Sequence, residues 1–290
     1  PARRPSGVAV WGFCKSLISE FFDKTRNLSL LVEQKCDNVA PPMDTTTFTL
    51  KCWGPFACFS RPDGGKVERL SYPVPPPSAV RGIFSAIYSK PIEFWWQPVR
   101  VEVLKPIQYI ALRRNEVKDK ISVDATQIQK WMEGEEIVPL VADADTSYFN
   151  NDKKGRTQRQ TMALKDVAYR LHAKIVPWPE FANQVKGLEA QFIRRAEKGK
   201  CFYQPAFGCR EFAAYFEPVT DEKFAQPSEP PEKSATQNIG LMVYDTFDLS
   251  VKNPPGTASP FVTLFHANLE NGIMEIPPFE SDAVLKPPRE

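Results

Sequence analysis

The stretch from Lys51 to Pro91 reads KCWGPFACFSRPDGGKVERLSYPVPPPSAVRGIFSAIYSKP, and its order of elements decides the fold. It joins the end of a Thr- and aromatic-rich strand to a basic excursion that turns at Gly64-Gly65. A helix is predicted over 79–88, because Ser78 follows three prolines as a typical N-cap and Lys90-Pro91 closes the pattern. A strand, a turning excursion and a helix therefore follow one another within about forty residues.

Four later patterns extend this beginning. Alternation of apolar and polar residues predicts strands over 99–110, 167–176 and 206–216, and helical spacing predicts a second helix over 188–200. The order becomes strand, helix, strand, strand, helix, strand. This order is typical of a ferredoxin-like, or RRM-like, βαββαβ fold of the α+β class, with the excursion after the first strand as a hairpin thumb.

The segments around this unit differ in composition. Residues 1–42 have a helical apolar rhythm and end just before Met43, so we interpret them as an extension, either upstream readthrough or a docking helix. The chain is predicted to divide into four parts. An extension (1–42) precedes a ferredoxin-like domain (43–217) that contains a polar insertion (118–160), and a linker (218–237) leads to a C-terminal antiparallel β subdomain and tail (238–290). Strands of the last part are predicted over 239–249, 261–269 and 273–277.

Composition restricts the classes of function. The 290 residues include 42% hydrophobic and 25% charged residues, and the net charge is +2. This charge is too low for a protein that coats duplex DNA through charge alone, so any nucleic-acid surface must be local. No run approaches the roughly 18 apolar residues of a membrane-spanning helix, and we expect no membrane role. The sequence also has no Gly-rich phosphate loop or nucleophile elbow that would indicate an enzyme of small molecules.

Cysteine and histidine patterns predict no metal site. The six cysteines form no CxxC pair and have no histidine nearby, so we expect neither a metal nor another cofactor. No secretory signal is evident, and the cysteines are interpreted as reduced thiols of a cytoplasmic protein. Both histidines, His172 and His266, fall in strand-like apolar runs and are expected to be packed residues.

Aromatic residues beside cations characterise the thumb. This combination stacks on unpaired bases while it holds phosphates. The candidates there are Phe56, Phe59, Arg61, Lys66 and Arg69. Two more basic clusters contribute Arg113, Arg114, Arg194, Arg195 and Arg210. A solvated surface explains each cluster equally well by itself, so the residues alone leave RNA binding and an ordinary charged surface both open.

Five ordered motifs add a resemblance to a known family. They are CWGPFACFSRP (52–62), KVERLSYPVPPPSAVRGIFSAIYSKP (66–91), LRRNEV (112–117), FIRRAEKGKCF (192–202) and GCREF (208–212). Over about residues 47–278 the chain resembles the repeat-associated RAMP subunits of CRISPR systems, most closely the fifth Cas family in its d form, of subtype I-C.

The resemblance implies a metal-independent endoribonuclease without a cofactor. Such a protein cuts precursor CRISPR RNA at the base of the repeat hairpin, by attack of a 2′-hydroxyl on the neighbouring phosphate. It then keeps the product as a subunit of the Cascade surveillance complex, with the thumb over 54–72 on the 5′ handle. The implied partners are CRISPR RNA, the backbone and large subunits of type I-C Cascade and, through the complex, target DNA.

The family's catalytic set is a tyrosine at the end of the first helix and a lysine-histidine pair at the start of the second. The tyrosine falls on Tyr88, the lysine on Lys186 and the histidine position on Gly187. Gly187 removes the one member with a pKa near neutrality, so slow cleavage and a binding-only subunit are both open. Tyr88 would otherwise be a packing residue. Lys186 at a positive helix end fits a site completed by phosphate, and Tyr72 is either an auxiliary or a packing residue.

Overall fold

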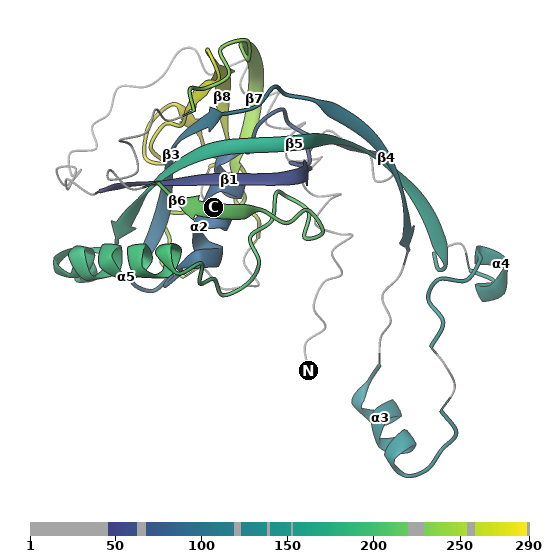
Figure 1. Cartoon of the computed structure of the whole chain (residues 1–290). Helices are drawn as coiled ribbons and strands as arrows, with labels where there is room; N and C mark the ends of the chain where they lie inside the picture. Colours follow the sequence, from purple (N-terminus) through teal and green to yellow (C-terminus); the bar gives the residue numbers. More distant parts are fainter. Residues whose placement is uncertain are drawn as a thin grey trace.

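The computed structural model describes residues 46–62, 68–118, 123–137, 140–151, 153–219, 229–253 and 259–288. The extension over 1–42, the Gly64-Gly65 turn and Lys66 lie outside these ranges. In Figure 1 the strands of a large sheet cross the centre of the view, α2 and α5 lie below them, and β7 and β8 of a smaller sheet lie above. No helix in the described ranges is long and apolar enough to cross a membrane.

The long strand β5 (Arg156–Pro177) organises the large sheet. Its C-terminal half pairs antiparallel with β1 (Thr47–Ala57) and with β3 (Phe94–Val103), and β6 (Tyr215–Pro218) and β9 (Ile273–Glu275) complete the order β6-β1-β5-β3-β9. Leu171 of β5 lies opposite Leu50 of β1 and Val101 of β3, and all three are fully buried. This apolar row fixes the register, because a slip of one residue would turn it to the other face.

The N-terminal half of β5 forms a second set of pairs. It runs antiparallel to β4 (Tyr109–Val117) and parallel to the short β2 (Glu68–Leu70). β4 and β5 therefore form a long hairpin that projects from the body, and α3 (Ala125–Met132) and α4 (Thr146–Phe149) lie at its far end (Figure 1). The sequence predicts one strand over 99–110 and a polar insertion over 118–160, whereas the structure ends β3 at Val103, begins β4 at Tyr109 and extends β5 back to Arg156. These additional strand residues are largely polar and show little apolar alternation, so no local pattern indicated them.

Helices α2 (Pro77–Ile87) and α5 (Val185–Glu197) meet around one group of aromatic side chains. α2 buries Val80, Ile83, Phe84 and Ile87, which are spaced as one helical face. The Phe84 ring lies 4.9 Å from Trp96 and 5.7 Å from Phe192, and Trp96 lies 4.8 Å from Phe192. These contacts hold both helices against the sheet, and the two predicted helices are confirmed with slightly shifted ends. The predicted N-cap is wrong, because α2 already begins at Pro77, so Ser78 lies inside its first turn and Pro76 takes the cap position without a side-chain hydrogen bond.

The predicted strand over 206–216 is mostly a tight loop. An isolated bridge joins Ala206 to Ala213, and regular pairing begins only at Tyr215 in β6. Gly208, with a φ of +83°, and the hydrogen bond from Phe207 N to Phe212 O at 2.8 Å turn the chain back between the two bridge residues. Glycine adopts this backbone conformation readily, and it ends the extended run after Phe207.

The C-terminal residues contribute to both sheets. β7 (Gln237–Asp245) and β8 (Thr263–Leu269) pair antiparallel, and β10 (Val284–Leu285) adds to β8. β9 differs from the expectation, because it pairs with β3 and so extends the large sheet. The hydrogen bond from Val103 N to Gly272 O at 2.8 Å brings the turn before β9 to the end of β3. His172 and His266 lie in strands β5 and β8, as predicted, and His172 is hydrogen-bonded to Thr49 and Glu102. His266 is exposed, because it falls on the outward face of β8, so the expectation of a packed residue is wrong for it.

Candidate functional site

Tyr88 is held firmly where α2 ends. Its backbone is extended, its N–H donates to Phe84 O at 2.9 Å, and its carbonyl accepts from Trp96 Nε1 at 2.8 Å. The side chain is 3% exposed, and its ring lies 5.3 Å from Phe94. Because both the backbone and the ring are fixed, the phenol has one position relative to the helix end.

Burial raises the pKa of the Tyr88 phenol. The ammonium of Lys90 and, more weakly, the guanidinium of Arg195 oppose this shift, whereas the carboxylate of Glu93 adds to it. Lys90 is exposed, so the hydroxyl end of Tyr88 lies near the protein surface although its ring is buried. A phenol with a raised pKa stays protonated at neutral pH and is suited to donate a proton rather than to accept one.

Two cations border the Tyr88 hydroxyl. Lys90 Nζ donates to Glu93 Oε1 at 2.8 Å, and this hydrogen bond raises the pKa of Lys90 and keeps it charged. Arg195, on the last turn of α5, donates from Nε to Ile87 O at 2.6 Å and stacks 4.2 Å from the Phe202 ring. Arg195 therefore binds the C-terminal end of α2, and its charge is close enough to act on Tyr88.

Lys186 lies at the other end of α5, as its second residue. It is exposed, and its Nζ forms no hydrogen bond or ion pair with any residue that the structure describes. The first turn of α5 has no acidic residue, and the Gln184 side chain does not cap it. An uncapped helix N-terminus with a free lysine is a favourable place for a phosphate.

The approach to α5 is tied to the loop after Tyr88. The 3-10 segment η1 (Pro179–Gln184) precedes α5, and Trp178 before it donates from its backbone N to Glu93 O and from Nε1 to Pro91 O, both at 2.9 Å. The residue after Lys186 is Gly187, and a Cβ built there meets nothing within 4 Å. No contact in the described structure joins Tyr88 to Lys186 directly, so any joint action would be through a bound substrate.

The predicted thumb aromatics are less available than the sequence implies. Phe59 is 2% exposed, and its ring lies 6.0 Å from Phe207 and 6.2 Å from Tyr169 in the core, so no face is open to a base. Phe56 is half-buried against Phe212, with ring centroids 5.8 Å apart. Tyr72, at 3% exposure, is a packing residue. The sequence could have indicated the burial of Phe59, because this residue closely follows the first strand and has apolar neighbours in the sequence.

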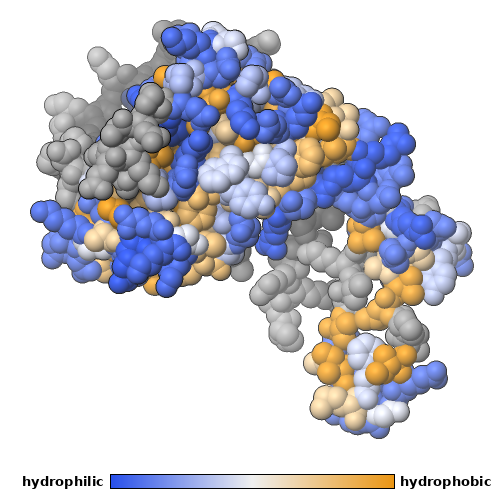
Figure 2. All heavy atoms as spheres, viewed as in Figure 1, coloured by the Kyte–Doolittle hydropathy of each residue, from blue (hydrophilic) through white to orange (hydrophobic). Residues whose placement is uncertain are grey.

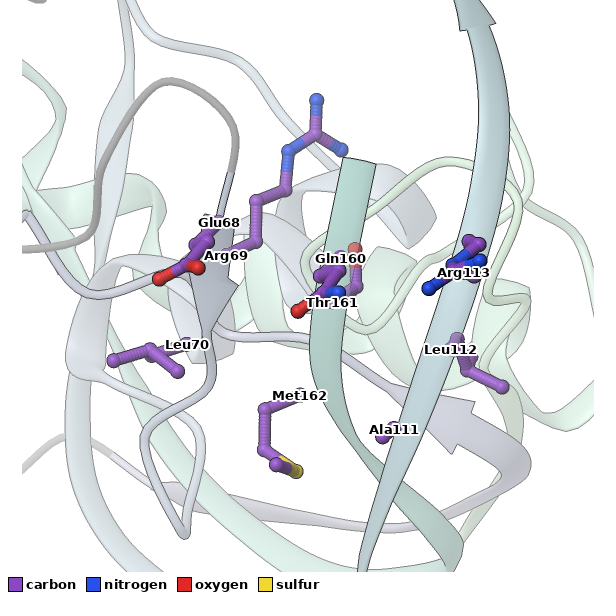
Figure 3. Close-up of a pocket in the computed structure, with 9 residues that line it drawn as sticks. All are labelled: Glu68, Arg69, Leu70, Ala111, Leu112, Arg113, Gln160, Thr161 and Met162. Atoms are coloured by element: carbon purple, nitrogen blue, oxygen red, sulfur yellow. The ribbon is translucent and has the colours of Figure 1, made fainter. Parts of the chain in front are cut away.

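A groove crosses the hairpin beside the thumb. It has a volume of about 470 Å³ and lies between β2, β5 and β4 (Figure 3). Leu70 and Met162 form paired apolar positions of its floor and are 43% and 39% exposed. Figure 3 shows Arg69 and Arg113 on opposite sides of β5. Along the alternating strands, Arg113 and the carboxylate of Glu68 share the exposed face of this apolar floor, whereas Arg69 falls on the other face of β2 and contacts Glu116. The groove thus combines an apolar floor with one cation, Arg113, that is available to unpaired RNA.

The arginines predicted to meet phosphate differ in their freedom. Arg113 is exposed and forms no ion pair or hydrogen bond with the described residues. Arg69 contacts Glu116 at 3.5 Å, and Arg114 is bonded to Glu211. The others are partly engaged or surface-exposed: Arg61 lies over Tyr72, Arg194 bonds to Gln191, and Arg210 lines a separate pocket of about 720 Å³ with Tyr203 and Gln204.

Comparisons with known proteins identify the family. The sequence model for Cas5d, described as a CRISPR-associated protein, matches residues 47–277. The chain belongs to the Cas5d family. A CRISPR pre-crRNA endoribonuclease Cas5d of Mannheimia succiniciproducens is 37% identical over 240 residues, which cover 82% of this chain and 97% of that protein. The protein of the same name from Thermus thermophilus is 35% identical over 79% of this chain and 90% of its own length.

Solved structures agree at the level of the fold. The crystal structure of a CRISPR-associated protein superposes with a TM-score of 0.52 over 83% of this Cas5d chain and 96% of that chain, at 19% identity. The motif-based resemblance is therefore confirmed by sequence and by fold.

The structure adds one feature of the candidate site that the motifs did not indicate. Lys90, two residues after Tyr88, lies close enough for its charge to act on the phenol, and its position just beyond the end of α2 could have indicated this. Outside this site, Cys58 packs beside Cys209 and Phe212, and hydrogen bonding with the Cys209 thiol lowers the pKa of Cys58 to about 7. Among the described residues, no group of three or more His, Cys, Asp or Glu side chains is placed to hold a metal ion.

Proposed function

We propose that this Cas5d protein cleaves precursor CRISPR RNA at the base of the repeat hairpin, at a site between the end of α2 and the start of α5. Both curated relatives are named pre-crRNA endoribonucleases. The observation that supports the site best is the fixed phenol of Tyr88, whose hydroxyl end lies beside Lys90 and Arg195. A protonated phenol flanked by cations suits a reaction in which negative charge develops on phosphate.

The proposed reaction divides among these groups. The 2′-hydroxyl loses its proton to a water molecule and attacks the adjacent phosphorus, the bond to the 5′-oxygen breaks, and the products are a 2′,3′-cyclic phosphate and a 5′-hydroxyl. Tyr88 donates a proton to the departing 5′-oxygen. Lys186 and the N-terminus of α5 hold the phosphate, and Arg195 adds positive charge. Gly187 provides no side chain with a pKa near neutrality that could accept the 2′-hydroxyl proton, so we expect slow, metal-independent cleavage.

A ferredoxin-like core over 43–217 is part of this proposal. The elements β1, α2, β3, β5, α5 and β6 follow the βαββαβ order, and the sheet order β6-β1-β5-β3 supports it. In this arrangement the β4–β5 hairpin is an insertion into one loop of the core, and the linker over 218–237 leads to the C-terminal strands.

The RNA path that we propose follows the groove of Figure 3. After cleavage the 5′ handle would lie on Leu70 and Met162, with its phosphates near Arg113. Retention of the product would make the protein a subunit of type I-C Cascade in the cytoplasm, next to the backbone and large subunits and, through them, target DNA.

A cleavage assay tests the proposal. Purified protein in excess over a radiolabelled repeat hairpin, in EDTA, should cut once at the 3′ base of the stem and leave a cyclic phosphate. A 2′-deoxy substitution at the scissile nucleotide should abolish the cut and preserve binding. Cleavage of the 2′-deoxy RNA at the normal rate would contradict the proposed chemistry.

Gly187 supports a second candidate function. A Cas5d protein with glycine at this position could bind the 5′ handle as a structural subunit of Cascade without cutting. In the same assay this alternative predicts tight binding of the hairpin, with no product after prolonged incubation.

A further inference from the structure

The far end of the β4–β5 hairpin presents apolar side chains without a core of its own. We refer to residues 123–137 and 140–151 as the arm tip. Its helix α3 has no buried residue, although Ile128, Trp131 and Met132 have the spacing of one helical face. In Figure 1 the arm tip lies away from both sheets. A helix of this length is marginal in water unless its apolar face is covered.

The exposed apolar residues of the arm tip form one surface. Figure 2 shows hydrophobic residues gathered over α3 and the neighbouring chain at the end of the arm. Their exposed fractions include 83% for Met132 and 66% for Ile137. The other exposed members are Val123, Ile128, Leu140, Val141 and Tyr148. Contiguous exposed apolar groups of this kind indicate a contact with another molecule.

Local hydrogen bonds hold the arm tip in shape. Asp124 caps α3 by accepting from Gln127 N at 2.7 Å. Arg156 N donates to Ala144 O at 3.0 Å and so fastens the returning chain to the start of β5. The apolar face is therefore presented on a capped helix at the end of a paired hairpin.

The charge of the arm tip decides which class of molecule covers it. Its sequence includes six carboxylates, at positions 124, 133, 135, 136, 143 and 145, and one cation, Lys130, for a net charge of −5. Glu135 lies 3.8 Å from Lys130 and Asp145 lies 3.9 Å from Arg156, whereas among the described residues no cation lies within salt-bridge distance of the other four carboxylates. Exposed charges act over about 8–10 Å at physiological salt, so these four carboxylates repel RNA phosphates. The occupant is thus a protein surface that is apolar at its centre and basic at its rim.

We propose that the arm tip docks α3 into an apolar, Lys- and Arg-rimmed groove of another protein subunit of the RNA-bound complex. Ile128, Trp131 and Met132 enter the groove as a helix-in-groove contact, and the surrounding carboxylates pair with its basic rim. This inference rests on the proposed function in one respect, which is that the partner is a subunit of the same RNA-bound complex. Cleavage itself takes place on the body and does not need the arm tip.

Reconstitution of the complex tests this surface. The subunits encoded beside this chain are assembled with CRISPR RNA, and incorporation of the protein is measured by native mass spectrometry over a concentration series. The double variant Ile128→Glu with Met132→Glu should enter the complex about tenfold less well or worse, because charged residues cannot occupy an apolar groove. The matched control Val251→Glu, at a position of 44% exposure on the body between β7 and β8, should assemble like the wild type.

Two further variants separate the possible occupants. Glu135→Lys with Glu136→Lys should also weaken incorporation. The truncation Ile128→Ala with Met132→Ala, which changes no charge, should weaken incorporation and leave RNA binding by the isolated protein unchanged. Weaker RNA binding by this truncated variant would identify RNA as the occupant and overturn the proposal. Normal assembly of the double variant, or a wild-type dimer that the double variant dissociates, would overturn it as well. If the isolated wild-type protein does not cleave the repeat hairpin, the proposed function is contradicted, and the docking surface is not.

Discussion

Restoring a histidine at position 187 should convert this protein into a faster nuclease. Gly187 is the third residue of α5 and follows Lys186. A Cβ there meets no atom within 4 Å, and Gly187 is not among the glycines with a positive φ, so a side chain fits without movement of the backbone. The variant Gly187→His places an imidazole beside the proposed phosphate site at the N-terminus of α5.

The size of the effect follows from two contributions. A positioned general acid or base with a pKa near 6.5 accelerates proton transfer by about 10²–10⁴-fold, and we expect at least the lower figure. Replacing glycine in a helix by histidine also stabilises the fold by about 0.3–0.5 kcal/mol, and Gly187→Ala stabilises it by about 1 kcal/mol. Gly187→Ala is therefore the matched control, because it shares the gain in stability without the imidazole.

Single-turnover cleavage of the repeat hairpin in EDTA measures the rate for each variant. Gly187→His should also show a rate that depends on pH near the histidine pKa, whereas the wild type and Gly187→Ala should not. If Gly187→His cleaves no faster than Gly187→Ala while both bind the hairpin, position 187 does not face the scissile phosphate and the assignment of the α5 N-terminus is refuted.

Three further outcomes are expected. Glu102→Gln should lower the free energy of unfolding by about 3–5 kcal/mol in urea denaturation, because the carboxylate is 7% exposed and its loss leaves Arg170 buried without its ion-pair partner; a change below about 1 kcal/mol would contradict this. Cys58 should ionise with a pKa of about 7, measured by the ultraviolet absorbance of its thiolate with Cys58→Ser as the blank, and this pKa should rise in Cys209→Ala, which loses the stabilising hydrogen bond. Because the folded pKa lies below the unfolded value of about 8.5, the stability that the thiolate contributes is fully present above about pH 8.5 and is lost as the pH falls through about 7. Arg113→Ala should weaken RNA binding and reduce its salt dependence by about one phosphate contact, whereas an unchanged salt slope would place the RNA elsewhere.

Elements with their own periodic apolar face were predictable from the sequence. The buried stripe of α2 and the turn chemistry around it gave both the helix and the position of Tyr88 at its end. The hairpin of β4 and β5 was missed, since its strands are stabilised mainly by backbone pairing and show little apolar alternation. The pairing of β9 with β3 depends on contacts between residues more than 170 positions apart, which no local pattern encodes.

The candidate site was predictable in its residue types and less so in its contacts. The motifs located Tyr88 and Lys186, and Lys90 is close to Tyr88 in the sequence itself. The proximity of Arg195 to the end of α2 arises only from the meeting of α2 with α5. Phe59 illustrates the opposite error, because an aromatic residue in a basic segment was predicted to stack on RNA and is instead part of the core. Burial depends on tertiary packing, and a window of sequence cannot distinguish the two outcomes.

The most direct test of the account compares cleavage with binding in Tyr88→Phe. This variant removes one oxygen and keeps the ring packed against Phe94, so the fold and the affinity for the repeat hairpin should be preserved. We predict that its single-turnover cleavage rate falls by about 10²-fold or more, because the proton donor for the departing 5′-oxygen is lost. A variant that binds and cleaves at the wild-type rate would show that Tyr88 is only a packing residue and would contradict the proposed site.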